Sequence, residues 1–199
     1  MSLLALCKTE DDVDRLLAKC MYSTKICALT FWPETFDSKF CEKHDELFAI
    51  IDGRAPRSKN VIVGGRGVGK TTCLRACVAR NVLFRHKRYI TYISQSEEAA
   101  IESTEEIKRM LISNEYIKRL EEFGNMKKRP DINDVEDSFS KKSWVAHWPG
   151  DGGKFPIKVL PRGAGQQVRG RLFQSHRPDL IILDDLEDKE TITNDTIRE

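Results

Sequence analysis

The apolar residues near the start of the chain follow the pattern of an amphipathic helix. Between Glu10 and Met21 they recur three and four residues apart, at Val13, Leu16, Leu17 and Cys20. This spacing gathers them on one side of a helix. Thr9 precedes the run and is suited to cap it, and acidic residues follow in the first turn, where they oppose the helix dipole. The pattern predicts a helix over Glu10–Met21.

A second helix is predicted over Cys41–Ile51, where Asp52 and Gly53 provide the stop signal. The intervening segment Phe31–Phe40 is aromatic and contains a proline, which favours an irregular but packed segment. Arg54–Lys59 is polar, also contains a proline, and is predicted to be a loop.

From residue 60 onward, short apolar runs alternate with helical patterns. Asn60–Val63 leads with an apolar run typical of a buried strand, and Thr71–Phe84 reads as a helix. Tyr89–Ile93 is a second run rich in β-formers, and Ser94–Ser96 would cap a helix that continues to about Leu111. This alternation of strand and helix predicts an α/β fold with a parallel sheet.

The last third of the chain adds three more strand candidates. Trp144–Trp148 and Ile157–Leu160 are short, with a glycine-rich turn at Gly150–Gly153 between them, and Leu180–Leu183 is a wholly apolar run. The segment Gly124–Lys142 is highly charged and has no periodicity, so it is predicted to be a mobile connection or a peripheral helical insert.

Composition supports a soluble globular protein with two regions. The 199 residues are 40% hydrophobic and 32% charged, the balance of a chain with a packed core. Residues 1–53 are predicted to be a helical and irregular segment that packs on the core, and residues 54–199 to be the α/β core. The net charge of +2 neither demands nor excludes a nucleic-acid partner.

The six cysteines show neither CxxC pairs nor zinc spacing. They are predicted to be small buried side chains of a reducing compartment, with Cys73 and Cys77 on one helix face. No stretch is apolar enough to span a membrane, and Met1–Cys7 lacks the basic leader and length of a signal peptide. A cytoplasmic location is predicted.

The segment Gly64–Thr71 reads Gly-Gly-Arg-Gly-Val-Gly-Lys-Thr and fits the P-loop pattern G-x-x-x-x-G-K-[ST] without a mismatch. Glycines let backbone N–H groups converge on phosphate oxygens, and the following helix points its positive end at them. Lys70 is expected to reach the β- and γ-phosphates of ATP, and the hydroxyl of Thr71 to coordinate Mg²⁺. The predicted nucleotide-binding residues are Gly64, Gly65, Arg66, Gly67, Val68, Gly69, Lys70, Thr71 and Thr72.

A carboxylate at the end of a neighbouring strand completes the metal site of such proteins. The run Leu180–Leu183 followed by Asp184 fits this Walker B pattern, so Asp184 is the predicted metal-side acid. Hydrolysis also needs a group that orients or deprotonates water. Asp185 and Glu187 are both candidates, because they share a side if the backbone is extended, and the sequence does not choose between them. The adenine contacts are sought in Phe40–Arg57, just upstream.

Three segments around these motifs are distinctive. Arg66–Thr71 has the order R-x-x-G-K-T, and Tyr89–Ser94 is followed by a helix rich in Glu and Ala. The most specific feature is the sequence Gly-Ala-Gly-Gln-Gln-Val-Arg-Gly at 163–170 ahead of Arg-Pro-Asp-Leu-Ile-Ile-Leu-Asp-Asp-Leu-Glu at 177–187. From about Phe31 to Glu190 the chain resembles the N-terminal ATPase domain of the large terminase subunit, the DNA-packaging motor of tailed bacteriophages and related viruses.

The resemblance implies a P-loop NTPase of the additional-strand type that drives double-stranded DNA into a procapsid in the host cytoplasm. It also implies a homo-oligomeric ring on the portal protein, the small terminase subunit as a partner, and an arginine that acts across the subunit interface. Arg169, Arg171 and Arg177 are candidates for that arginine, and Arg66 for bracing the phosphate; a surface salt bridge is the alternative for each. Large terminase subunits continue with further strands and a nuclease domain, so this sequence is expected to be a fragment without nuclease activity.

Two other functions remain open from the sequence. One is a helicase-like or other P-loop ATPase that acts on nucleic acid. The other is a nucleotide-binding fragment with no turnover of its own. The basic clusters Lys127–Arg129 and Lys141–Lys142 offer phosphate contacts, but acids interleave with them, which favours a solvated loop.

Overall fold

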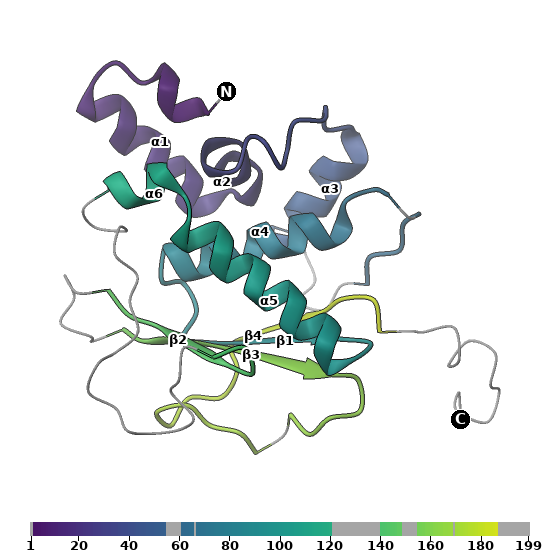
Figure 1. Cartoon of the computed structure of the whole chain (residues 1–199). Coiled ribbons are helices and arrows are strands. Elements are labelled where there is room, and N and C mark those ends of the chain that lie inside the picture. Colours follow the sequence, from purple (N-terminus) through teal and green to yellow (C-terminus); the bar gives the residue numbers. More distant parts are fainter. Residues whose placement is uncertain are drawn as a thin grey trace. The chain divides into compact units, whose positions relative to one another are not determined.

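The structure, a computed structural model, describes residues 2–54, 61–65, 67–120, 140–148, 155–168 and 170–186. These residues form a mixed α/β fold with a four-stranded, mostly parallel sheet flanked by helices (Figure 1). The chain divides into two compact units, which are described separately below. Unit 1 comprises residues 1–84 and 107–125, and unit 2 comprises residues 85–106 and 126–199. None of the described helices is both long and apolar enough to cross a membrane.

The regular secondary structure in the described part of unit 1 is helical. Its elements are η1 (Leu3–Leu6), α1 (Glu10–Tyr22), α2 (Thr24–Phe31), α3 (Glu42–Ile51), α4 (Lys70–Leu83), the end of α5 (Glu97–Ile112) and α6 (Glu115–Arg119). The predicted helices α1, α3 and α4 are confirmed. Thr9 caps α1 as expected, through a reciprocal capping box with Asp12. The helices α2 and α6 were not predicted from the pattern.

The aromatic segment after α2 is irregular and packed, as predicted. Trp32 and Phe36 are buried. The indole Nε1–H of Trp32 donates to the carbonyl of Met110 at 2.9 Å. The side-chain amide of Asn114 donates to the carbonyl of Phe31. These two bonds join the C-terminal end of α2 to the end of α5 and the start of α6, within unit 1.

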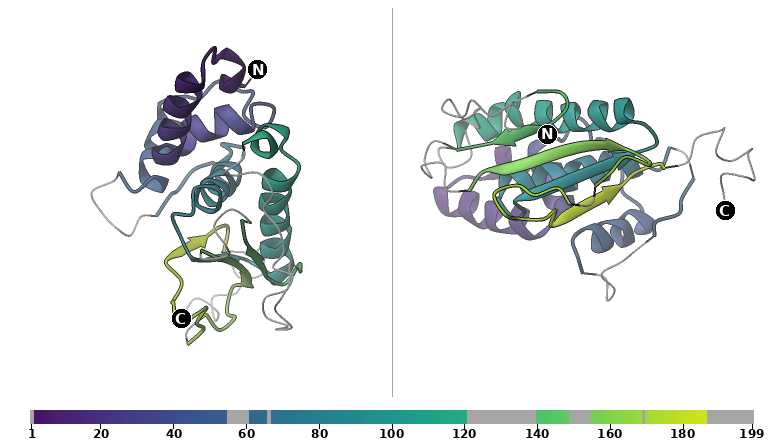
Figure 2. Two further views of the ribbon diagram at one scale, coloured as in Figure 1. Left: turned by 90° about the vertical axis from the view of Figure 1, so that its left-hand side faces the viewer. Right: turned by 90° about the horizontal axis from the view of Figure 1, so that it is seen from below.

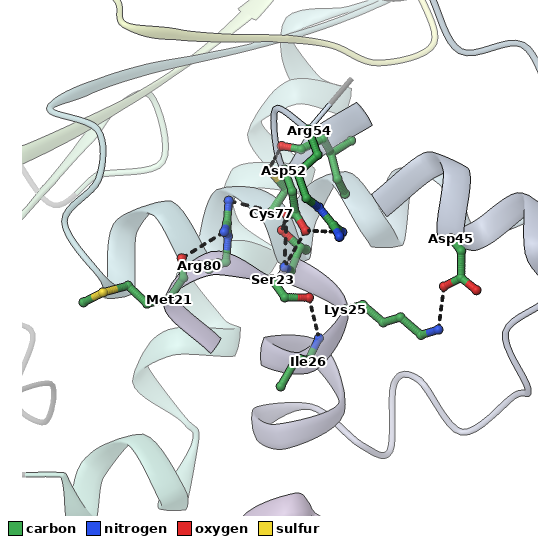
Figure 3. A network of polar contacts seen from close by, with 11 residues as sticks. Met21, Ser23, Lys25, Ile26, Asp45, Asp52, Arg54, Cys77 and Arg80 are labelled. Atoms are coloured by element: carbon green, nitrogen blue, oxygen red, sulfur yellow. Dashed lines mark hydrogen bonds and ion pairs between the residues drawn. The ribbon is translucent and has the colours of Figure 1, made fainter. Parts of the chain in front are cut away.

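A buried polar network, drawn in Figure 3, ties three helices of unit 1 together. The carboxylate of Asp52, at the end of α3, is fully buried and accepts from the backbone N–H of Thr24 at 3.0 Å and from its hydroxyl. Arg54 donates to the same carboxylate at 3.1 Å. The guanidinium of Arg80, from α4, lies 3.5 Å from it and also donates to the carbonyl of Met21. The network fixes the helix that follows the glycine loop against α2 and α3.

The sheet belongs to unit 2 and has the order β2-β3-β1-β4 (Figures 1 and 2). Its strands are β1 (Tyr89–Ser94), β2 (Trp144–Ala146), β3 (Ile157–Gly163) and β4 (Leu180–Leu183). Strand β1 pairs in parallel with β3 and β4 on its two sides, whereas β2 adds antiparallel to β3. The strand β1 and the helix α5, capped by Ser96, confirm the predicted strand and helix after residue 88, and the three later strand candidates are confirmed as strands. The predicted parallel sheet is confirmed except at β2.

One face of the sheet carries a buried apolar cluster that includes the first residue of β1. Tyr89 packs with Val145, Leu160 and Phe173 in a buried cluster on one face. Trp144 and Trp148 are also fully buried. The start of α5 lies next to the sheet in Figure 1.

Strand β4, the wholly apolar run of the sequence, is buried on one face only. Among the described residues β4 pairs only with β1 and is an edge strand. Ile182 is buried, but the side chains of Ile181 and Leu183 on the other face are 50% and 58% exposed. An apolar run therefore does not by itself report burial on both faces, because burial also requires a neighbouring layer.

The prediction of a buried strand at Asn60–Val63 is wrong for its described part. Val61 and Val63 are 90% and 92% exposed, and residues 61–63 belong to no strand. A strand exists only where a partner accepts its hydrogen bonds, and the described part of unit 1 offers no other strand. Asn60, the Gly150–Gly153 turn and most of Gly124–Lys142 lie outside the described residues.

Four of the six cysteines are buried free thiols, as predicted: Cys20, Cys27, Cys73 and Cys77. The prediction of burial is wrong for Cys41, which is exposed, and for Cys7, which is only partly buried. Burial raises the pKa of Cys73 and of Cys77 to about 11, so both stay protonated at neutral pH and have little nucleophilic character.

Gly163, the last residue of β3, is expected to tolerate no side chain. A Cβ built there would lie 2.7 Å from the backbone nitrogen of Glu97 and 3.1 Å from the carbonyl carbon of Ser96, and backbone cannot shift as easily as a side chain. We expect Gly163→Ala to lower the free energy of unfolding by about 1–3 kcal/mol, as in other overpacked sites. Urea denaturation followed by circular dichroism measures this. The control is Gly65→Ala, where a Cβ meets nothing within 4 Å; equal losses in both variants would contradict the prediction.

Candidate functional site

The glycine loop of unit 1 has a backbone that only glycine adopts readily. Gly67 and Gly69 have φ of 81° and 75°, in the region that disfavours a Cβ. Gly69 is the N-cap of α4, and no side chain caps the helix. A Cβ on Gly65, Gly67 or Gly69 would meet nothing within 4 Å. The loop therefore presents the positive end of a fourteen-residue helix beside uncrowded backbone.

Lys70, the first residue of α4, bends back over the loop. Its ammonium group donates to the carbonyls of Gly64 at 2.7 Å and Gly65 at 3.0 Å. The positive charge thus lies against the same turn of chain that carries the glycines. Thr71 and Thr72 follow in the first turn of the helix, both half-buried. Arg66 lies outside the described residues.

His44 contacts the loop, although the sequence did not single it out. Its Nδ1 accepts from the backbone N–H of Cys41 at 3.0 Å, so in the neutral ring Nε2 carries the hydrogen and donates to the carbonyl of Val68 at 3.1 Å. The ring of Phe40 lies 5.5 Å from the imidazole. His44 falls within Phe40–Arg57, where the adenine contacts were sought, but no sequence signal marked it.

In unit 2, Asp184 lies at the carboxyl edge of the sheet, where the predicted metal-side acid was expected. It comes directly after β4, and its backbone N–H donates to the carbonyl of Ile93 at 2.9 Å. The residue is 7% exposed. The hydroxyl of Tyr92, from the middle of β1, donates to Oδ2 of Asp184 at 2.6 Å. The carboxylate is therefore held from a strand that the sequence analysis did not connect with it.

The backbone at Asp185 is not extended. Its φ is 49°, a left-handed conformation that Asp and Asn tolerate better than most residues. Its carbonyl accepts from the N–H of Gln95 at 3.1 Å, and the residue is exposed. The premise that Asp185 and Glu187 share a side of an extended chain is therefore wrong at Asp185, because the chain turns there. Glu187 lies outside the described residues.

A second group of polar side chains lies on this edge. Oε1 of Gln166 accepts from the N–H of Gly163 at 3.0 Å, and its Nε2 donates to Oε2 of Glu97 at 2.8 Å. Ala164 donates through its N–H to the carbonyl of Ser94. Gln166 thus clamps the loop after β3 to the first turn of α5. The carboxyl ends of parallel strands are where α/β proteins place their ligands.

The predicted arginine and lysine contacts are exposed where the structure describes them. Arg171 and Arg177 are exposed, as are Lys141 and Lys142. Arg169 and Lys127–Arg129 lie outside the described residues. The structure therefore does not select a trans-acting arginine.

Each unit contains an oxygen donor of the kind that a hydrated Mg²⁺ on a nucleotide accepts. Mg²⁺ prefers oxygen ligands, keeps several waters and is commonly held by one or two protein groups together with phosphates. In unit 1 the donor is the hydroxyl of Thr71, and in unit 2 it is the buried carboxylate of Asp184. Within the part of the chain that the structure describes, no group of three or more His, Cys, Asp or Glu side chains is placed to hold a metal ion.

No protein-family model matches this chain, and the comparisons with curated proteins and with solved structures likewise return no significant match.

Proposed function

We propose that this chain binds Mg²⁺–ATP through the glycine loop and hydrolyses it. The observation that carries the proposal is a complete G-x-x-x-x-G-K-[ST] sequence whose described glycines and following helix suit a phosphate-binding loop. Gly67 and Gly69 take left-handed φ values, and α4 begins directly at Lys70. A chance glycine-rich turn has no reason to combine these with an uncapped helix start and a lysine folded over the loop.

Each residue has one role in this proposal. Backbone N–H groups of the loop and of the first turn of α4 bind phosphate oxygens. The ammonium of Lys70 gives up its hydrogen bonds to the loop carbonyls and donates to the β- and γ-phosphates instead. When bound, Mg²⁺ neutralises phosphate charge and orders those oxygens. On the sequence motifs, Thr71 and Asp184 would be the groups of this chain that hold it. A carboxylate oxygen of Asp185 accepts a proton from the attacking water, with Glu187 as the alternative.

The work driven by hydrolysis is proposed to be the translocation of double-stranded DNA into a viral procapsid. The support is the resemblance of this sequence to the ATPase domain of the large terminase subunit. Two parts of that resemblance meet in the fold, since Gln166 of the 163–170 segment bonds to Glu97 at the start of the helix after β1. The partners would be the portal protein, the small terminase subunit and further copies of the chain in a ring.

One observation favours a second candidate, a chain that binds nucleotide without turning it over. Val61 and Val63, immediately before the loop, are almost fully exposed and belong to no strand. A loop anchored on one side only is held less firmly than a loop between a strand and a helix. Catalysis depends on placing reacting groups within about an ångström, whereas binding tolerates more freedom.

Steady-state phosphate release separates the two candidates. The purified chain is incubated with Mg²⁺–ATP, with and without double-stranded DNA. Turnover that DNA stimulates supports the packaging ATPase. Nucleotide binding without phosphate release under both conditions supports the binding module. If the chain binds no nucleotide, both candidate functions are refuted.

Asp184→Ala is expected to weaken nucleotide binding in Mg²⁺ more than in EDTA. The substitution removes a carboxylate that serves the metal-bound waters and leaves the glycine loop unchanged. We expect a loss of roughly tenfold or more in Mg²⁺, measured with a fluorescent ATP analogue. The control is Asp179→Ala, which removes a carboxylate that contacts the start of β1 instead, at Arg88 and Tyr89. Equal losses with and without Mg²⁺ would contradict the assignment of Asp184.

A further inference from the structure

The hydroxyl of Tyr92 donates a hydrogen bond to Asp184, the predicted metal-side acid. Tyr92 is fully buried in the middle of β1, and Asp184 is almost as buried at the end of β4. The 2.6 Å separation of the phenol oxygen and Oδ2 is that of a strong O–H···O⁻ hydrogen bond. Such a bond is worth most where water does not compete for it.

The sheet register explains why these two side chains meet. Tyr92 pairs with Ile182 across the parallel ladder. Asp184 is two residues further along, so its side chain projects to the same face as that of Tyr92. The ladder continues past β4, because the N–H of Asp184 bonds to Ile93 and the N–H of Gln95 bonds to the carbonyl of Asp185. Strand β1 therefore fixes both the backbone of Asp184 and the rotation of its carboxylate.

We propose that Tyr92 is a positioning residue that holds the Asp184 carboxylate ready for the hydrated Mg²⁺ of the nucleotide. This inference rests on the proposed function. A phenol suits the task because it is a neutral donor: it satisfies one buried carboxylate oxygen and leaves the negative charge in place for the cation. Lysine or arginine at position 92 would orient the carboxylate too, but would offset its charge and compete with the metal.

Tyr92→Phe tests the inference because it removes only the hydroxyl and keeps the buried ring. We expect the affinity for a fluorescent ATP analogue to fall roughly tenfold in Mg²⁺, the scale found for groups that orient metal ligands, and to stay unchanged in EDTA. Tyr89→Phe is the matched control. It removes a hydroxyl from the same strand on the opposite face, where Tyr89 packs against Phe173. This control should match the parent protein in both solutions.

A second arm separates positioning from general support of the fold. In an Asp184→Ala background, Tyr92→Phe should change the Mg²⁺ dependence no further, because the group it positions is gone. Circular dichroism and thermal unfolding check that each variant is folded.

The possible outcomes separate this inference from the proposed function. If the parent binds nucleotide with the expected Mg²⁺ dependence and Tyr92→Phe does not alter it, the positioning role is overturned and the proposed function stands. A loss of equal size in Mg²⁺ and EDTA, or an additional loss in the Asp184→Ala background, shows a structural role and also overturns it. If the parent itself binds no nucleotide, the proposed function fails and this inference fails with it.

Discussion

Lys70→Ala is expected to abolish measurable ATP binding and any phosphate release. The ammonium group is the positive side chain of the described loop, and it already lies within 3.0 Å of two loop carbonyls. Its removal takes away the positive charge nearest the described part of the loop and leaves backbone N–H groups as the main protein donors to the polyphosphate there. Truncating one partner of such a charge pair costs about 2–5 kcal/mol, so affinity should fall by roughly two orders of magnitude or more. Equilibrium binding of a fluorescent ATP analogue measures the loss.

The control removes a positive charge from the same unit but from another surface. Lys43 is exposed on α3, and Lys43→Ala should bind ATP like the parent protein. Lys70→Arg retains the charge but replaces the compact ammonium with a larger, planar guanidinium group. Its ATP affinity should therefore stay far below that of the parent protein. Unchanged ATP affinity in Lys70→Ala would refute the glycine loop as the phosphate site.

What could be predicted from the sequence is what depends on local chemistry. Helix α1 was predicted with its cap, because Thr9 and the apolar spacing act within a few residues of each other. The start of α4 and the glycines with positive φ follow from the loop motif alone. Asp184 could be placed because an apolar run followed by an acid describes a strand that ends at the edge of a sheet.

The features that depend on distant partners could not be predicted. Val61 and Val63 look like a strand, but a strand needs a neighbour, and none is present in the described part of unit 1. The bond from Tyr92 to Asp184 spans 92 positions and requires the register of β1 and β4. His44 reaches the loop across 24 positions. The turn at Asp185 is a single dihedral angle that the pattern of a charged loop does not reveal.

Asp52→Ala is expected to produce the largest loss of stability. The fully buried carboxylate accepts from Thr24 and faces Arg80, whose side chain is itself 7% exposed. Removing the acid leaves a buried guanidinium without its counter-charge and the N–H and hydroxyl of Thr24 without their acceptor. Breaking a buried pair in this way costs about 3–5 kcal/mol. Chemical denaturation followed at the helical circular dichroism band measures the change.

Two variants make this result specific. Asp52→Asn keeps the shape and one acceptor oxygen, so it should lose less stability than the alanine variant. Asp45→Ala breaks the exposed pair with Lys25, also drawn in Figure 3, and should cost less than about 1 kcal/mol.

The Asp52 network also bears on nucleotide binding, because Arg80 belongs to α4, the helix that begins at Lys70. If α4 loses this contact near its C-terminal end, the first turn of the helix, where Lys70 lies, is also held less firmly. Asp52→Ala should therefore weaken ATP binding in Mg²⁺ and in EDTA alike, unlike Asp184→Ala and Tyr92→Phe, whose losses should appear only with Mg²⁺. Unchanged stability in Asp52→Ala would show that the network does not anchor α4.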